Sequence, residues 1–112
     1  MDIEIKVSFV APDKDRPLWQ KILTGLCKGE AGALFQERML VFGEAVDQKL
    51  EAILDEWPVE YFEGQYWKKT GNQFEVGFQT ASDGDEFAEE LRTLFALCGV
   101  SALEIELSGY YE

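Results

Sequence analysis

The sequence predicts one α+β domain over residues 1–112, built on an antiparallel sheet with its helices on one face. Three observations predict this class: two segments alternate apolar and polar residues with a period of two, three segments repeat apolar residues at helical spacing, and two β-prone runs meet at a short turn. A chain of 112 residues is the usual size of one domain, and 46% hydrophobic residues are enough for a folded core.

The first two predicted elements are a strand and a helix. Residues 2–9 alternate as a half-buried strand does, and a helix follows with Asp15 as N-cap, Pro17 in the first turn and Gly29 at the end. The strand directs Ile3, Ile5, Val7 and Phe9 to one side and Asp2, Glu4, Lys6 and Ser8 to the other, and the helix repeats Leu18, Trp19, Ile22, Leu23, Leu26 and Cys27.

The middle of the chain is partly ambiguous. Residues 30–43 contain a short apolar run that could be a strand or a buried helix, because such a run does not show its period; we favour a strand. A second helix is predicted over 44–57 and is ended by Pro58. Its apolar stripe is Val46, Leu50, Ile53, Leu54 and Trp57, and its outer face carries Glu44, Asp47, Glu51, Asp55 and Glu56.

The last third of the chain predicts a hairpin, a helix and a strand. Two aromatic runs, 59–69 and 73–80, flank Thr70-Gly71-Asn72, which tolerates a tight turn. Ser82 or Asp83 can cap a third helix that ends at Gly99. A final strand places Leu103, Ile105 and Leu107 on one side and Glu104 and Glu106 on the other.

Without residues 30–43 the predicted order is strand, helix, strand, strand, helix, strand, with the helix at 44–57 inserted before the hairpin. This order is typical of the split βαβ arrangement called ferredoxin-like, in which the first and last strands are neighbours and both main helices cover one face. The other face stays open. The alternation places Asp2 and Glu4 on that face beside Glu104 and Glu106, with Glu75 nearby.

The charge of the chain is strongly negative and unevenly spread. The net charge is −12, and nearly all of it falls in residues 44–63, with seven acids against Lys49, and in residues 82–112, with eight acids against Arg92. Such an imbalance steers encounters with cationic partners and repels nucleic acid. We therefore expect a basic protein partner and no direct nucleic-acid binding.

The acidic sheet face has three interpretations. Like charges on neighbouring strands destabilise a sheet, so these carboxylates could be solvated residues that prevent aggregation, with Lys6 relieving some repulsion. They could instead dock a basic surface, or hold a metal. For docking, aromatic anchors would be needed, because aromatic residues dominate interface energetics. The steering residues would be Glu4, Glu75, Glu104 and Glu106, and the anchors Tyr61, Trp67 and Tyr110, with Tyr66 and Tyr111 as further candidates.

Most catalytic chemistry has no support in the sequence. The chain has no histidine, so the usual general base and metal ligand are missing, and no phosphate-binding glycine loop occurs. Cys27 and Cys98 suggest two small buried side chains rather than a disulfide or metal site. We expect no cofactor, no metal, no membrane segment and a cytoplasmic location.

These observations favour a non-enzymatic acidic domain that binds a basic protein surface, as an inhibitor or immunity protein does. One alternative is a DNA mimic that occupies the nucleic-acid groove of another protein. Another is a structural homo-oligomer. The oligomeric state, monomer or homodimer, stays open at this point.

Overall fold

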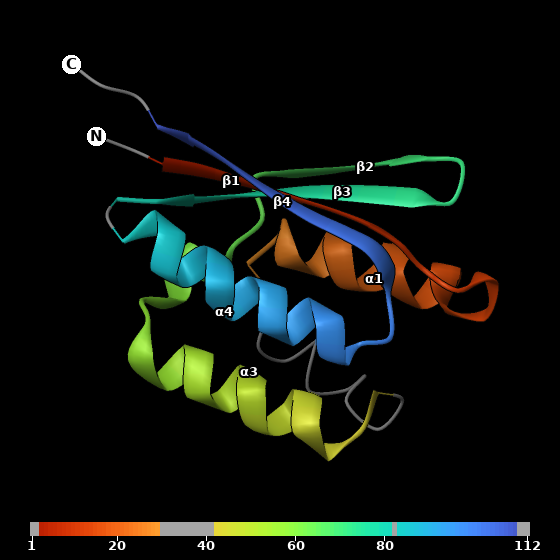
Figure 1. Cartoon of the computed structure of the whole chain (residues 1–112), viewed down its shortest axis with the longest axis horizontal. Helices are drawn as coiled ribbons and strands as arrows, with labels where there is room; N and C mark the ends of the chain where they lie inside the picture. The colour runs from red at the N-terminus through yellow and green to blue at the C-terminus, as the bar shows by residue number, and fades with distance from the viewer. Residues whose placement is uncertain (1–2, 30–41, 82, 110–112) are drawn as a thin grey trace.

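The computed structural model describes residues 3–29, 42–81 and 83–109 of the chain (Figure 1). The predicted strand or helix at 30–43 therefore lies almost wholly outside the described residues, as do Asp2, Ser82, Tyr110 and Tyr111. The described elements are β1 (Ile3–Val10), the 3-10 helix η1 (Asp13–Asp15), α1 (Arg16–Leu26), α3 (Glu44–Glu56), the 3-10 helix η2 (Val59–Phe62), β2 (Tyr66–Thr70), β3 (Gln73–Thr80), α4 (Gly84–Leu97) and β4 (Ser101–Gly109).

The four strands form one antiparallel sheet in the order β2-β3-β1-β4. The first and last strands are neighbours, as the sequence predicted. Ser8 in β1 lies opposite Glu75 of β3 and opposite Glu104 of β4, which fixes the register at the centre of the sheet. The register of β4 shifts where Ala102 takes a positive φ of 50°, so a bulge separates the start of β4 from its straight part.

The helices lie on one side of the sheet, in two layers. Helices α1 and α4 face the sheet, and α3 contacts α4 on the side away from it (Figure 1). Three aromatic rings pack the sheet against α1 and α4. The ring centroid of Phe9 in β1 lies 4.7 Å from that of Trp19 in α1 and 5.4 Å from that of Phe95 in α4. All three are fully buried, and burial of a large apolar side chain contributes about 1.5–3 kcal/mol.

Helix α3 matches the predicted second helix. Its residues Val46, Leu50 and Ile53 are buried in the same hydrophobic cluster as the sheet residues, which shows that the apolar stripe packs inward. Its carboxylates are left on the outside.

The predicted strand over residues 59–69 is wrong in its first half. Residues 59–62 form η2, in which the amide of Tyr61 donates to the carbonyl of Pro58 over 3.0 Å, and β2 begins only at Tyr66. The turn lets the Phe62 side chain reach the core, where it is 1% exposed. At Gly64 the chain passes so close to α1 that a Cβ would lie 2.9 Å from the Cys27 sulfur. Packing against α1 therefore overrides the β propensity of these aromatic residues.

Both cysteines are free thiols. Cys98 is buried, as predicted, and Cys27 is half-buried. None of the helices in the described ranges has both the length and the apolar character needed to cross a bilayer.

Candidate functional site

The four carboxylates predicted for steering lie on the open face of the sheet. Glu75, Ser8 and Glu104 form a row across β3, β1 and β4, and Glu106 lies opposite Lys6 one pair further on. Glu4 is on the same face of β1, two residues before Lys6. The structure thus brings Glu4, Glu75, Glu104 and Glu106 together on a surface that no described element covers (Figure 1).

Two of these four carboxylates are neutralised within the chain. The Lys6 ammonium lies 3.0 Å from Glu106, which raises the pKa of Lys6, first through this hydrogen bond. The Lys68 ammonium lies 3.6 Å from Glu75. Within the described residues Glu4 and Glu104 make no ion pair. The open face therefore carries much less net negative charge than the spacing of acids suggested.

Tyr66 on β2, which the sequence suggests as a further candidate for an aromatic anchor, lies on the same face. Its ring covers Gly77 of β3, where a Cβ would overlap the ring, and its hydroxyl donates to Glu75 over 2.9 Å. Burial, followed by the contact with the Glu75 carboxylate, raises the pKa of Tyr66 to about 12. This tyrosine is fixed as a structural part of the sheet, because an aromatic ring that covers a strand glycine stabilises the pair.

The predicted aromatic anchors do not join the four carboxylates. Trp67 lies on the helix side of β2, with its ring 6.3 Å from that of Phe74. Tyr61 lies in η2 and contacts the rings of Trp57 and Phe87 at 6.2 Å and 5.7 Å. Tyr110 lies outside the described residues. Sequence alternation could not have placed Tyr61, since the 3-10 turn interrupts the strand pattern.

The larger concentration of acid lies at one end of the helical layers, where α3 ends and α4 begins. Figure 1 shows α3 and α4 running in opposite directions, so that the end of α3, η2 and the start of α4 meet. We call this surface the acid-rich end; its carboxylates are exposed, and none makes an ion pair in the described part of the chain. They are Asp55, Glu56, Glu60, Glu63, Asp85 and Glu86.

Helix electrostatics do not account for all of these charges. Asp85 and Glu86 lie in the first turn of α4, where the helix dipole favours negative charge. Asp55 and Glu56 lie in the last turn of α3, where it disfavours negative charge, and that turn contains no basic residue. Each such charge costs about 0.3–1 kcal/mol at low ionic strength. The two acidic residues in the last turn of α3 therefore lower the stability of this helix.

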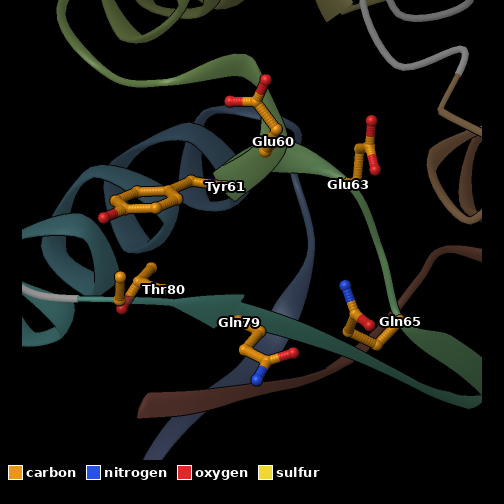
Figure 2. Close-up of a pocket in the computed structure, with 7 residues that line it drawn as sticks. Glu60, Tyr61, Glu63, Gln65, Gln79 and Thr80 are labelled. Atoms are coloured by element: carbon orange, nitrogen blue, oxygen red, sulfur yellow. The ribbon is translucent and has the colours of Figure 1, made fainter. Parts of the chain in front are cut away.

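A shallow hollow of about 330 Å³ opens beside the acid-rich end (Figure 2). Figure 2 shows Glu60 and Tyr61 on the η2 side and Gln79 and Thr80 on the β3 side. The Thr80 hydroxyl is buried and has no hydrogen-bond partner among the described residues. The hollow is lined by Glu60, Tyr61, Glu63, Gln65, Gln79, Thr80 and Ala81, so its polar groups are mostly acceptors or amides.

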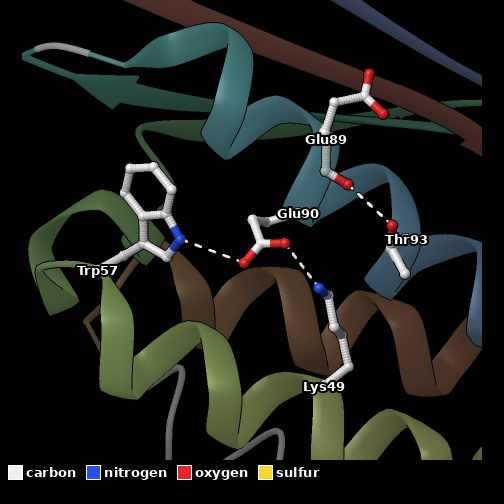
Figure 3. Close-up of polar contacts among 5 residues, drawn as sticks. All are labelled: Lys49, Trp57, Glu89, Glu90 and Thr93. Carbon is white, nitrogen blue, oxygen red and sulfur yellow. Dashed lines mark hydrogen bonds and ion pairs between the residues drawn. The ribbon is translucent and has the colours of Figure 1, made fainter.

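A network between α3 and α4 holds the acid-rich end together (Figure 3). The Glu90 carboxylate accepts hydrogen bonds from the Lys49 ammonium at 2.7 Å and from the Trp57 indole at 3.3 Å. The bond from Lys49 is the main reason why the pKa of Glu90 lies below its usual value. Glu90 thus stabilises the fold, and the only lysine of α3 is already engaged with it.

The described residues contain no cluster of three or more cysteines and carboxylates arranged to hold a metal ion. Comparison with protein-family models, with curated proteins and with solved structures found no significant match for this chain. The function must therefore be inferred from the surface itself.

Proposed function

We propose that this protein is a non-enzymatic, acidic protein-binding domain that recognises a basic protein surface, as an inhibitor or immunity protein does. The observation that carries this proposal is the acid-rich end, where six exposed carboxylates make no ion pair with any cation of the described residues. Charges of this kind raise the rate of encounter with a cationic partner and orient it.

The hollow adds a specific contact to this attraction. Glu60 and Glu63 border a space of about 330 Å³ that also exposes amide groups, which suits a lysine or arginine side chain of the partner. Tyr61, which lines the same hollow, supplies an aromatic surface to such a side chain. The predicted anchor Tyr61 is therefore kept in the proposed site, with Glu60 and Glu63 as its charged neighbours.

We further propose that the fold is the ferredoxin-like split βαβ arrangement, with α3 as an insertion. The sheet order β2-β3-β1-β4 and the position of α1 and α4 on one face support this. The free thiol state of both cysteines is in keeping with a cytoplasmic location.

Two variants with equal net charge test the proposal. The first replaces Glu56→Gln and Glu60→Gln at the acid-rich end, and the control replaces Glu44→Gln and Glu51→Gln on the outer face of α3. A basic protein captured from an extract of the source cell, released by salt and purified, is mixed with each variant, and association rates are measured at low and high salt.

We expect the acid-rich end variant to associate about two- to tenfold more slowly at low salt, and the control to match the unmodified chain. The difference should shrink at high salt, because screening weakens exposed charges. Equal rates for the two variants, or a rate independent of salt, would refute the proposal. Mutual competition with duplex DNA for the partner would instead identify the DNA-mimic alternative.

A further inference from the structure

The sheet has two edges, and they differ in length and charge. Strand β2 is five residues long and carries Lys68 and Lys69, whereas β4 is nine residues long and carries Glu104 and Glu106. No strand in the described part of the chain pairs with the outer side of β4. A strand edge of this kind presents unpaired amides and carbonyls that can accept another strand.

The side chains of β4 divide into an apolar row and an acidic row. Leu103, Ile105 and Leu107 lie on the helix side, and Leu107 is 47% exposed. Glu104 and Glu106 lie on the open face, and Glu104 has no ion pair in the described ranges. The bulge at Ala102 ends regular pairing at the start of the strand, so the usable edge begins at Leu103.

A second copy of this chain does not fit the β4 edge well. In the antiparallel registers centred on residues 104–106, a glutamate of one copy lies opposite a glutamate of the other. Like charges directly opposite each other on neighbouring strands are destabilising. A strand that alternates basic and apolar residues fits both rows. Its cations face the open-face row, where Glu104 makes no ion pair in the described ranges and Glu106 is shared with Lys6, and its apolar residues extend the helix-side row.

We propose that β4 binds an extended segment of the partner, in which lysine or arginine alternates with apolar residues, as an additional strand of the sheet. This inference rests on the proposed function for the basic character of the partner and adds the binding mode. The lysines on β2 would repel the same segment, so the two edges are not equivalent.

The test uses a fluorescent eight-residue peptide of alternating lysine and valine. Its control has the same composition with all lysines followed by all valines, and two further peptides carry N-methyl groups on the amides of one edge or the other. Binding is measured by anisotropy, and protection of residues 103–108 by amide hydrogen exchange.

We expect the alternating peptide to bind more tightly than the block peptide, to protect β4, and to lose binding when one of its two edges is N-methylated. Glu104→Gln should weaken binding about two- to fivefold, whereas Glu51→Gln on α3 should leave it unchanged. Equal binding of the alternating and block peptides, or protection on β2 instead of β4, would overturn the inference. Self-association of the chain through β4, detected by sedimentation, would do the same.

These outcomes are separable from those of the proposed function. Binding of a basic protein that depends on Glu56 and Glu60 but leaves β4 unprotected would refute strand addition and leave the proposed function intact. Specific pairing of the peptide with β4, when the extract contains no basic protein partner, would refute the proposed function. The inference that β4 accepts an alternating basic and apolar strand would then still hold.

Discussion

Replacing Glu90 by glutamine should destabilise the fold measurably, because this residue joins α3 to α4. Its carboxylate accepts two hydrogen bonds, and the Glu90 and Lys49 side chains are only 22% and 24% exposed. A hydrogen bond to a charged group contributes about 1.5–3 kcal/mol when it is well buried. Partial exposure and the acceptor retained by glutamine reduce this, so we expect Glu90→Gln to cost about 1–2 kcal/mol.

The neighbouring residue Glu89 provides the control. Its ion pair with Arg92 spans one helical turn at 3.3 Å, and its side chain is 69% exposed, so Glu89→Gln should cost no more than about 0.5 kcal/mol. Both substitutions change the net charge equally. Urea denaturation measures the two free energies of unfolding. In thermal denaturation, Glu90→Gln should lower the melting temperature by about 4–8 °C.

The pH dependence of this difference follows from the direction of the pKa shift. The pKa of Glu90 in the folded state lies below its usual value of 4.5. Its contribution is therefore complete above pH 4.5 and is lost as the pH falls through the lower folded-state pKa. Equal destabilisation by Glu89→Gln and Glu90→Gln at neutral pH, or a difference that grows in acid, would refute this account of the helix contact.

Three further predictions concern the open face and the cysteines. Gly77→Ala should cost about 1–3 kcal/mol in urea denaturation, because a Cβ overlaps the Tyr66 ring, and much less in a Tyr66→Ala background. Alkaline titration followed by ultraviolet absorbance should show one phenol with a pKa of about 12 that is absent from Tyr66→Phe; loss of a different phenol would contradict the contact with Glu75. In a Cys27→Ser variant, burial and a pKa of about 12 should keep Cys98 unreactive to thiol reagents until the chain unfolds, and rapid labelling of the native protein would show that the cysteine is accessible.

The regular elements could be predicted because their patterns reflect which side is buried. Most apolar residues of the alternating strands β1 and β4 and of the stripes on α1, α3 and α4 belong to the core or pack against it, whereas Leu107 near the end of β4 is exposed. The first half of the strand predicted over residues 59–69 is wrong, because β propensity is the only local signal there and it does not report the packing against α1. The amide of Gly64 donates to the carbonyl of Leu26 over 2.9 Å, a contact between residues far apart in sequence that no local pattern contains.

The candidate site was harder to predict than the fold. Strand alternation correctly grouped four carboxylates on one face, but it could not show that Lys68 lies beside Glu75, since that depends on hairpin register. The acid-rich end joins residues from α3, η2 and α4, and sequence alone does not give the direction in which α3 crosses α4. The sequence shows the excess of acidic residues in 44–63. It does not show that the end of this helix lies beside the start of α4.

The position of the charges separates those that stabilise the protein from those that do not. Glu90, Glu75 and Glu106 each have a cation within 4 Å and form part of the folded structure. Asp55 and Glu56 lie in the last turn of α3, where a lysine would interact favourably with the helix dipole and a carboxylate does not. A contribution to folding stability therefore explains the three glutamates that form ion pairs. It does not explain Asp55 and Glu56 at the end of α3. A cationic partner that approaches this surface would supply the missing positive charge, which is why we propose that first contact occurs at the acid-rich end rather than at the open face of the sheet.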